Sequence, residues 1–398
     1  MMVLKEKYVL YLYVLLWVFY DLQSLLDMKG SALSLGIVLV LNVVSLYYLV
    51  KVNLWKGKNP TYLNALNLLV LMFTVYGVIH CLDGPHYMVG VQADKPYNYL
   101  KAIYNSLLPI YIFYYFACKG SLNMRLLSIL VFVFFFTAIL SFWNYGNHLR
   151  EVMEQNGVDR DGFVNNLGYE FLALFPILSF FRKRPVLQYV GMIVLMSFLL
   201  LGMKRGAILI GFLCMLLFLM EMFKSAKRFN KIVIIVLSLV AVLVVTFFLF
   251  HMLSSNQFFQ YRLRVTLEGN SSGRDLIYST FFNYLIYDTS VSEFLFGAGA
   301  NATLEVFVNY AHNDWLELAV NQGVLGVLLY AYYWYAAYKA WKVMDRTDGT
   351  RFAFGLVLFI FFMRTIFSMS YGSMNIYVTC VVGYCLGTLK MSQRRIET

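Results

Sequence analysis

The sequence predicts an all-α polytopic membrane protein with about 12 transmembrane helices and one large extracytoplasmic loop. Hydrophobic residues make up 61% of the 398 positions and charged residues 13%, whereas a soluble domain has about 45–50% apolar and about 25% charged residues. The apolar residues form runs of roughly 20, the length that a helix needs to cross a bilayer. Lysine and arginine gather in short clusters between these runs, which is the pattern that sets membrane topology.

The first apolar run, residues 8–26, follows Lys5 and Lys7. It is too long for the core of a signal peptide and lacks a small-residue cleavage site, so we expect a retained membrane anchor. Eleven similar runs follow it along the chain. The predicted spans are 8–26, 32–50, 62–80, 99–118, 126–143, 167–181, 186–202, 207–223, 232–253, 315–341, 352–369 and 374–389.

The basic clusters predict the orientation of these spans. With the amino terminus in the cytoplasm, about two thirds of all Lys and Arg fall on the cytoplasmic side, as the positive-inside rule requires. Both termini are then cytoplasmic, and the polar loops at 81–98, 144–166 and 254–311 lie outside. The clusters are Lys5/Lys7, Lys51/Lys56/Lys58, Lys119/Arg125, Arg182/Lys183/Arg184, Lys224/Lys227/Arg228/Lys231, Lys339/Lys342/Arg346/Arg351 and Lys390/Arg394/Arg395.

Several functional classes are disfavoured. The net charge of +11 comes from the topology clusters, so we do not expect nucleic acid as a partner. The five cysteines lie mostly inside apolar runs without metal-type spacing and indicate neither a disulfide framework nor a zinc site. The chain has no Gly-rich nucleotide loop, paired catalytic carboxylates, serine nucleophile elbow or Asp-x-Asp cluster, so an enzyme that uses a nucleotide sugar and a metal is disfavoured.

The large loop divides the chain into three parts. We expect spans one to nine in residues 1–253, the extracytoplasmic loop in 254–312 and the last three spans in 313–398. Within the loop, Ser272 with Asp275 resembles a helix start, in which Ser272 is the N-cap. The apolar residues that follow are spaced for one face of a helix lying on the membrane surface. They are Leu276, Ile277, Phe281, Phe282, Leu285 and Ile286.

Two later features of the loop point to close packing around a histidine. Gly297-Ala298-Gly299 forms a small-residue turn that permits close approach of the backbone. His312 precedes a helix for which Asn313 is a plausible N-cap, with Asp314 and Glu317 in the first turn. An imidazole suits removal of a proton from a hydroxyl at neutral pH, although a histidine at a helix start is more often structural. Small residues along this helix predict close helix packing; they are Ala319, Gly323 and Gly326.

Basic residues outside the cytoplasm form the second part of the candidate site. Lys204-Arg205 lies in the shortest outer connection, so Arg205 is expected at or just below the lipid headgroups. Arginine binds phosphate well because its planar guanidinium makes paired hydrogen bonds. Arg262, Arg264 and Arg274 add positive charge to the large loop; for Arg262 and Arg264, contact with anionic lipid headgroups is an equal alternative.

Three further polar residues are candidates. Arg364 lies within an apolar span, where a charge usually faces a functional cavity or a partner. Its alternative role is an ion pair with an acid such as Glu170. In the loop before the sixth span, Arg160 and Asn166 could lie at a cavity mouth or in a solvated turn.

These residues resemble a known family. His312-Asn313, nine residues and then Gly323-Val324-Leu325-Gly326 is similar to the His-Asn, nine residues, Gly-x-x-Gly pattern of the bacterial O-antigen ligase and O-antigen polymerase superfamily. Three lesser matches occur in the expected order, so the resemblance covers roughly residues 160–330. They are residues 160–176 with Gly162, Phe163 and Asn166; Lys204-Arg205-Gly206-Ala207, where Lys replaces the family's Ser; and Ser272-Gly273-Arg274 with Gly297-Ala298-Gly299.

The resemblance implies a lipid-phosphate-sugar-dependent (C-type) glycosyltransferase of the cell inner membrane that works without a metal or other cofactor. The donor would be a glycan on undecaprenyl pyrophosphate. By carry-over, His312 is the base or orients the acceptor, while Arg205 and Arg274 hold the pyrophosphate. The predicted substrate-binding residues are Lys204, Arg262, Arg264, Asn313, Arg160, Asn166 and Arg364. Expected partners are the lipid-linked glycan, its acceptor, membrane lipid and, as a further candidate, a chain-length regulator protein.

Three functions remain open. In a polymerase of O-antigen or capsular polysaccharide, the acceptor is a sugar of another lipid-linked unit; in a ligase it is the lipid A core. The family's ligases often show Arg-x-x-x-Leu in the large loop, and Arg262, Arg264 and Arg274 all lack that leucine, which favours a polymerase. A flippase for lipid-linked oligosaccharides fits twelve spans as well, but transporters usually have related halves and a site at mid-membrane.

Overall fold

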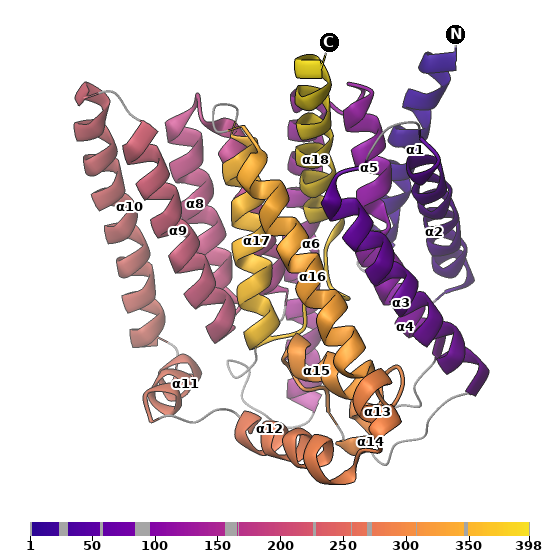
Figure 1. Cartoon of the computed structure of the whole chain (residues 1–398). Helices are drawn as coiled ribbons and strands as arrows, with labels where there is room; N and C mark the ends of the chain where they lie inside the picture. Colours follow the sequence, from indigo (N-terminus) through magenta and orange to yellow (C-terminus); the bar gives the residue numbers. More distant parts are fainter. Residues whose placement is uncertain are drawn as a thin grey trace.

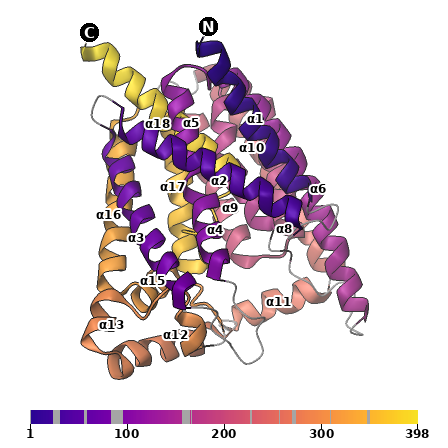
Figure 2. The ribbon, with the colours of Figure 1, turned by 90° about the vertical axis from the view of Figure 1, so that its right-hand side faces the viewer.

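The computed structural model describes residues 2–23, 31–55, 59–83, 96–155, 165, 167–225, 228–255, 257–268, 273–307, 309–345 and 349–397. Over these ranges the protein is all-helical and contains no β-strand. Figures 1 and 2 show a helical bundle with both termini at one end and α11 to α14 at the other. The predicted all-α architecture is therefore confirmed.

The amino-terminal helices form one side of the bundle. They are α1 (Met2–Leu22), α2 (Ala32–Asn53), α3 (Thr61–Asp83), α4 (Pro96–Leu107), α5 (Pro109–Cys118) and α6 (Met124–Gln155). The predicted span 99–118 is interrupted at Leu108, because Pro109 cannot continue the backbone hydrogen bonds of α4 and begins α5 instead. The carboxy-terminal α18 (Ile376–Glu397) packs against α5. Glycine makes this approach possible, since a Cβ on Gly383 would lie 2.5 Å from the Cβ of Phe113.

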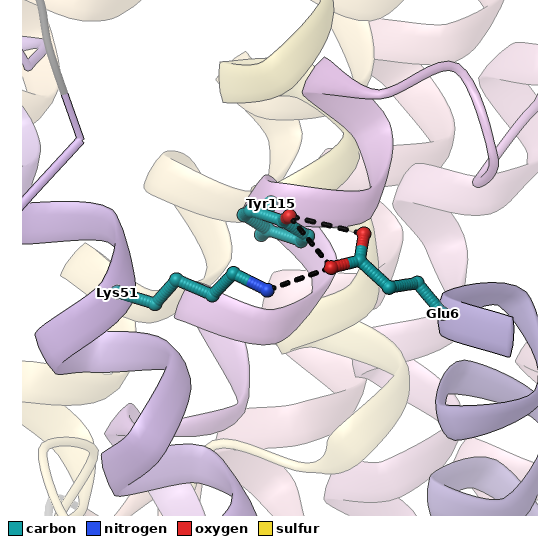
Figure 3. A network of polar contacts seen from close by, with 3 residues as sticks. All are labelled: Glu6, Lys51 and Tyr115. Carbon is teal, nitrogen blue, oxygen red and sulfur yellow. Dashed lines mark hydrogen bonds and ion pairs between the residues drawn. The ribbon is translucent and has the colours of Figure 1, made fainter. Parts of the chain in front are cut away.

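A polar cluster joins three of these helices at the end where the termini lie (Figure 3). Lys51 of α2 forms a 2.8 Å ion pair with Glu6 of α1, and the hydroxyl of Tyr115 in α5 donates to the same carboxylate at 3.1 Å. The Lys51 ammonium also lies 4.6 Å from the centre of the Tyr115 ring. The three contacts fix the first two helices against the core helix α5.

The middle of the chain forms the other side of the bundle. Its helices are α7 (Gly168–Leu178), the 3-10 turn η2 (Ser179–Phe181), α8 (Pro185–Leu201), α9 (Arg205–Ser225) and α10 (Arg228–Ser255). The start of α7 is held by Asn165, whose side chain donates to the carbonyl of Phe142 in α6 and accepts from the backbone N–H of Leu167. The backbone N–H of Asn165 donates to the carbonyl of Gly202 at 3.0 Å, so the turn between α8 and α9 lies against the start of α7.

Short helices cover the end of the bundle opposite the termini (Figures 1 and 2). They are α11 (Gln257–Leu267), α12 (Arg274–Asn283) with the π-helical turn η3 (Tyr284–Asp288), α13 (Val291–Phe296) and α14 (Thr303–Val306). The N-cap was predicted at Ser272, which lies outside the described residues; in the structure Gly273, with a φ of +78°, is the residue at the N-cap of α12. A capping box is present instead at Ser290 and Glu293 of α13.

The predicted amphipathic helix exists, but its apolar residues do not share one face. Ile277 and Phe281 are buried against the protein, whereas Leu276, Phe282 and Ile286 are exposed. Leu276 and Ile277 are adjacent in the chain, and adjacent positions of a helix point about 100° apart. The run is thus apolar on both sides of α12.

The predicted span 315–341 is two helices. They are α15 (Asp314–Asn321) and α16 (Gly323–Val343), followed by α17 (Thr350–Phe367). Gly323 has a φ of +64°, a left-handed conformation that ends α15 before α16 begins. The expectation of one continuous helix was wrong, and α15 belongs to the end of the bundle with the loop helices.

Six of the described helices are long and apolar enough to cross a membrane, and α7 with η2 and α8 are shorter apolar helices. These features show a polytopic membrane protein; the number of twelve spans stays a prediction. The six segments are Ala32–Asn53, Thr61–Asp83, Met124–Glu151, Arg205–Lys224, Lys231–Ser255 and Thr350–Phe367.

Candidate functional site

His312 lies on a tight turn between α14 and α15. Its φ is +52°, which residues with a side chain rarely adopt. On one side, the backbone N–H of Ala311 donates to the Glu317 carboxylate at 2.7 Å. On the other side, the Asn313 side chain accepts hydrogen bonds of 3.0 and 3.2 Å from backbone N–H groups in the first turn of α15. The N-cap predicted at Asn313 is thus confirmed, and both neighbours of the histidine are held in place.

Two acids in the first turn of α15 lie beneath this turn. Their positions match the prediction, but both Asp314 and Glu317 are 0% exposed. Asp314 accepts from the backbone N–H of Ser370 at 2.8 Å and from the hydroxyl of Tyr330 at 2.6 Å. It therefore joins α15 to α16 and to the segment after α17.

Glu317 joins α15 to the end of the loop. Besides Ala311, its carboxylate accepts from the hydroxyl of Thr303 and from Nδ2 of Asn321, the latter at 3.0 Å. Burial raises the pKa of Glu317 to about 7 and that of Asp314 to about 6. Buried acids are stabilising only when such donors surround them, so these residues hold the histidine turn to the bundle.

The imidazole of His312 is half-buried and within electrostatic range of two cations. Burial lowers its pKa below the usual value, and the positive charges of Arg274 and Lys204 lower it further. The imidazole is consequently neutral at pH 7 and can accept a proton. The structure thus brings His312, Arg274 and Lys204, three of the predicted site residues, into one electrostatic neighbourhood.

Tyr169 at the start of α7 is the centre of a group of basic side chains, Lys204 and Arg364, which we call the basic cluster. The Lys204 ammonium lies 6.0 Å from the centre of its ring, and the Arg364 guanidinium carbon lies 5.0 Å from it. Gly206 makes room for this ring, because a Cβ there would lie 2.7 Å from the Tyr169 hydroxyl oxygen. The Lys-Arg-Gly-Ala turn therefore packs its glycine against the tyrosine and places Lys204 over the ring.

Two arginines meet the carboxy-terminal end of α17. Arg274 Nη2 donates to the carbonyl of Phe367 at 2.8 Å. Arg364 Nη2 donates to the hydroxyl of Ser373 at 2.6 Å and to the carbonyl of Met369 at 3.3 Å. As expected, Arg364 lies within an apolar candidate span; its place is the last turn of α17, where the carbonyl end of the helix favours a cation.

The end of the large loop docks on α15 through its backbone. The N–H of Ala298 donates to the carbonyl of Val320 at 2.9 Å, and the N–H of Gly299 donates to that of Asn321 at 3.0 Å. A Cβ on Gly323 would lie 2.5 Å from the backbone nitrogen of Gly297. The close approach predicted for this small-residue turn is confirmed, and the first glycine of the Gly-x-x-Gly pattern is required by it.

The remaining predicted residues are not drawn into this cluster by the contacts described. Arg205 is the partly exposed first residue of α9, and Lys204 rather than Arg205 contributes charge at His312. Arg264 is exposed on α11 and lies over the neighbouring Tyr261 ring at 6.0 Å. Arg262 is part of α11, but its side chain lies outside the described residues, as do Arg160 and Asn166. Their roles stay predictions.

Sequence reasoning missed Tyr169 and the partners of the buried acids. Tyr169 looked like one more aromatic residue in an apolar run, and Ser370 lies 56 positions beyond Asp314. A signal was available for the acids, since two carboxylates at the start of a largely apolar segment need partners. Among the described residues, no group of three or more His, Cys, Asp and Glu side chains is arranged to hold a metal ion.

A family model described as O-antigen ligase matches residues 190–331. No curated protein and no solved structure matches the chain. The matched range contains His312, Lys204, Arg274 and the docked glycine turns, whereas Tyr169 and Arg364 lie outside it. The match indicates an enzyme of glycan transfer in a multi-pass bacterial membrane protein. Over these residues the chain is similar to the O-antigen ligase family, which supports its place in the O-antigen ligase and O-antigen polymerase superfamily.

Proposed function

We propose that the protein polymerises a bacterial surface polysaccharide by transferring a glycan from undecaprenyl pyrophosphate to a sugar hydroxyl, on the outer face of the cytoplasmic membrane. One observation carries the proposal: a half-buried imidazole with a lowered pKa, His312, lies beside the cations Arg274 and Lys204 on a turn anchored by buried acids. A proton acceptor and a site for a diphosphate are the two groups that this reaction needs. The family match supports the same reaction class.

The proposed transfer step needs only a proton acceptor and cations that stabilise the leaving diphosphate. The acceptor oxygen forms a bond to the anomeric carbon of the donor sugar, and the bond from that carbon to the pyrophosphate oxygen breaks. His312 takes the proton of the acceptor hydroxyl, which its neutral imidazole can do at pH 7. Arg274, Lys204 and Arg364 stabilise the negative charge that develops on the departing diphosphate. Arg205 is proposed to add to this charge from the start of α9.

The acceptor distinguishes the two proposed variants of the reaction. The large loop lacks the Arg-x-x-x-Leu pattern of many ligases, which favours a sugar acceptor and therefore a polymerase. The description of the matching family model, O-antigen ligase, favours a lipid A core acceptor. The partners of the polymerase would be two lipid-linked glycans in the membrane, with a chain-length regulator protein as a further partner.

The proposal is tested in cells that depend on this gene for surface glycan. His312→Ala is expected to abolish long-chain glycan while the protein stays in the membrane at normal amount, because the proton acceptor is gone. His251→Ala is the matched control, since this histidine is exposed near the end of α10 and its carbonyl makes only local hydrogen bonds. Unchanged glycan in His312→Ala would refute the role of the imidazole.

Purified protein separates the three candidate functions. A polymerase gives a ladder of product lengths from the lipid-linked glycan alone, whereas a ligase adds one block and requires lipid A core. A flippase moves the lipid-linked glycan across a vesicle membrane without making a glycosidic bond. Movement without bond formation would exclude glycan transfer as the activity.

A further inference from the structure

A cavity of about 810 Å³ with both polar and apolar walls lies beside the basic cluster and is separate from the His312 turn. Its walls come from α1, α4, α6, the start of α7, residues 372–375 and the first two residues of α18. The volume falls within the range of about 300–1,000 Å³ typical of sites for small organic ligands. None of its lining residues was predicted from the sequence as part of a site.

The lining combines aromatic rings with amides and hydroxyls. Trp17, Tyr145 and Tyr377 supply rings, while Asn105 and Ser141 supply polar groups. Sugar rings present apolar C–H faces and a rim of hydroxyls that both donate and accept hydrogen bonds, so such a mixture suits them. The chemistry of the walls therefore matches a short saccharide.

One buried acceptor in this cavity has no partner. The side-chain oxygen of Asn105 is inaccessible to solvent and makes no hydrogen bond within the protein. A buried polar atom is normally hydrogen-bonded, because an unpaired one costs about 1–3 kcal/mol. A ligand hydroxyl or amide would satisfy this oxygen once the Asn105 side chain turns it toward the cavity that the residue lines.

The charge of the lining differs from that of the basic cluster. Asp21 and Glu170 face the cavity together with one lysine, Lys101. Two carboxylates against one ammonium disfavour a diphosphate or an acidic sugar and favour uncharged or amino-bearing sugars. The neighbouring cluster of Lys204 and Arg364 has the opposite character.

The cavity and the basic cluster share a wall. Ser373 lines the cavity and accepts the 2.6 Å hydrogen bond from Arg364. Tyr169 packs against Arg364, and the next residue in the chain, Glu170, lines the cavity. A lipid-linked glycan with its diphosphate at the basic cluster would thus have its first sugars within reach of the cavity.

We propose that this cavity binds an uncharged or amino-bearing saccharide segment of the lipid-linked substrate, with Asn105 as one of its hydrogen-bonding residues. The inference rests on the proposed function, since it assigns the sugar portion of that substrate to a site distinct from the basic cluster, where the diphosphate is proposed to bind. The cavity then selects which glycan the enzyme accepts. His312 and the arginines act on the bond between sugar and phosphate.

The test measures whether saccharide protects the cavity from a thiol reagent. The exposed Cys81 is first replaced by serine, because the other cysteines are buried or partly buried. Ser141→Cys then places a thiol in the cavity, and Ser279→Cys places one on the exposed surface of α12 as a control. The purified protein in detergent is treated with a small methanethiosulfonate reagent. The probes are the saccharide released by mild acid from the lipid-linked glycan of the source cells, and trigalacturonate as an acidic comparison.

The released saccharide is expected to slow labelling of Ser141→Cys and to leave Ser279→Cys unchanged, while trigalacturonate has no effect. Asn105→Leu should weaken this protection about fivefold, the size expected for one lost hydrogen bond to a neutral group. A Ser141→Cys thiol that reacts at the same rate with and without saccharide, or that never reacts, would overturn the inference. Protection by trigalacturonate would contradict the assigned class of sugar.

A variant lacking the imidazole separates this inference from the proposed function. With His312→Ala, protection should persist although transfer is lost. If transfer depends on His312 but no saccharide protects the cavity, the proposed function stands and the cavity assignment fails. If saccharide protects the cavity but the wild-type protein transfers no glycan, the cavity assignment stands and the proposed function fails.

Discussion

Glu317→Gln should change how the stability of the protein depends on pH. The Glu317 carboxylate accepts from the backbone N–H of Ala311, the Thr303 hydroxyl and Nδ2 of Asn321. Asn321 cannot rotate its amide without loss, because its oxygen accepts from the backbone N–H of Thr303 at 3.0 Å. A glutamine amide therefore places an N–H against either the Ala311 N–H or the Asn321 amide, whichever way it turns.

The magnitude follows from this conflict and from the raised pKa. One unpaired buried donor costs about 1–3 kcal/mol, which is the expected loss in the free energy of unfolding of Glu317→Gln at pH 4.5. In the wild type, burial raises the pKa of Glu317 from 4.5 to about 7. The folded state thus holds this proton more tightly than the unfolded state, and the resulting stability is present below pH 4.5 and lost as the pH rises through 7. That loss amounts to about 3 kcal/mol at about 1.4 kcal/mol per pH unit.

The two proteins should consequently differ most in acid and converge by pH 8. Thermal unfolding in detergent at pH 4.5 to 8 measures this, with Glu268→Gln as the control, because Glu268 is exposed at the end of α11. Asp314, whose pKa is also raised, adds the same pH dependence of the free energy of unfolding to the wild type and to both variants. Unfolding midpoints of wild type and Glu317→Gln that run parallel over this range would refute the assignment of a buried, proton-binding Glu317.

Two further predictions concern the base and the docked loop. Because burial and the charges of Arg274 and Lys204 lower the pKa of His312, the rate of glycan transfer should fall in acid with an apparent pKa below 6.5. Arg274→Gln removes one of these charges and should raise that apparent pKa. An unchanged apparent pKa would contradict an electrostatic effect of Arg274 on His312. Gly323→Ala should lower stability by about 2–3 kcal/mol in thermal unfolding, because its φ of +64° disfavours a side chain and a Cβ would meet the backbone of Gly297. Gly36→Ala in α2 meets nothing within 4 Å and should be neutral or slightly stabilising; equal effects of the two substitutions would contradict the docking.

The sequence allowed much of the architecture to be predicted, because membrane spans and helix caps are local patterns. Apolar runs of spanning length located the helices, and the cap at Asn313 could be read from its position before an apolar run. Gly297 to Gly299 identified a close approach of the backbone without revealing its partner. That partner, the end of α15, became visible only in three dimensions.

The parts that could not be predicted depend on contacts between distant segments. The break at Gly323 was missed because the run 315–341 is apolar on both sides of it, so composition alone favoured one helix. Only some residues of the basic cluster could be predicted from the sequence. Lys204 and Arg364 meet at Tyr169 because α7, α9 and α17 pack together, which no spacing in the chain encodes.

The docking of residues 297–299 on 320–323 has a consequence for how the sequence of this protein can vary. The contact is made of main-chain atoms and glycines, so it does not depend on the identity of the side chains that α12 and α13 expose. Those side chains, such as Leu276 and Phe294, are exposed and can be exchanged without displacing the imidazole. The exposed surface of α12 and α13 can therefore change in sequence while the backbone around the His312 turn keeps its place, since main-chain hydrogen bonds and glycines hold the two segments together.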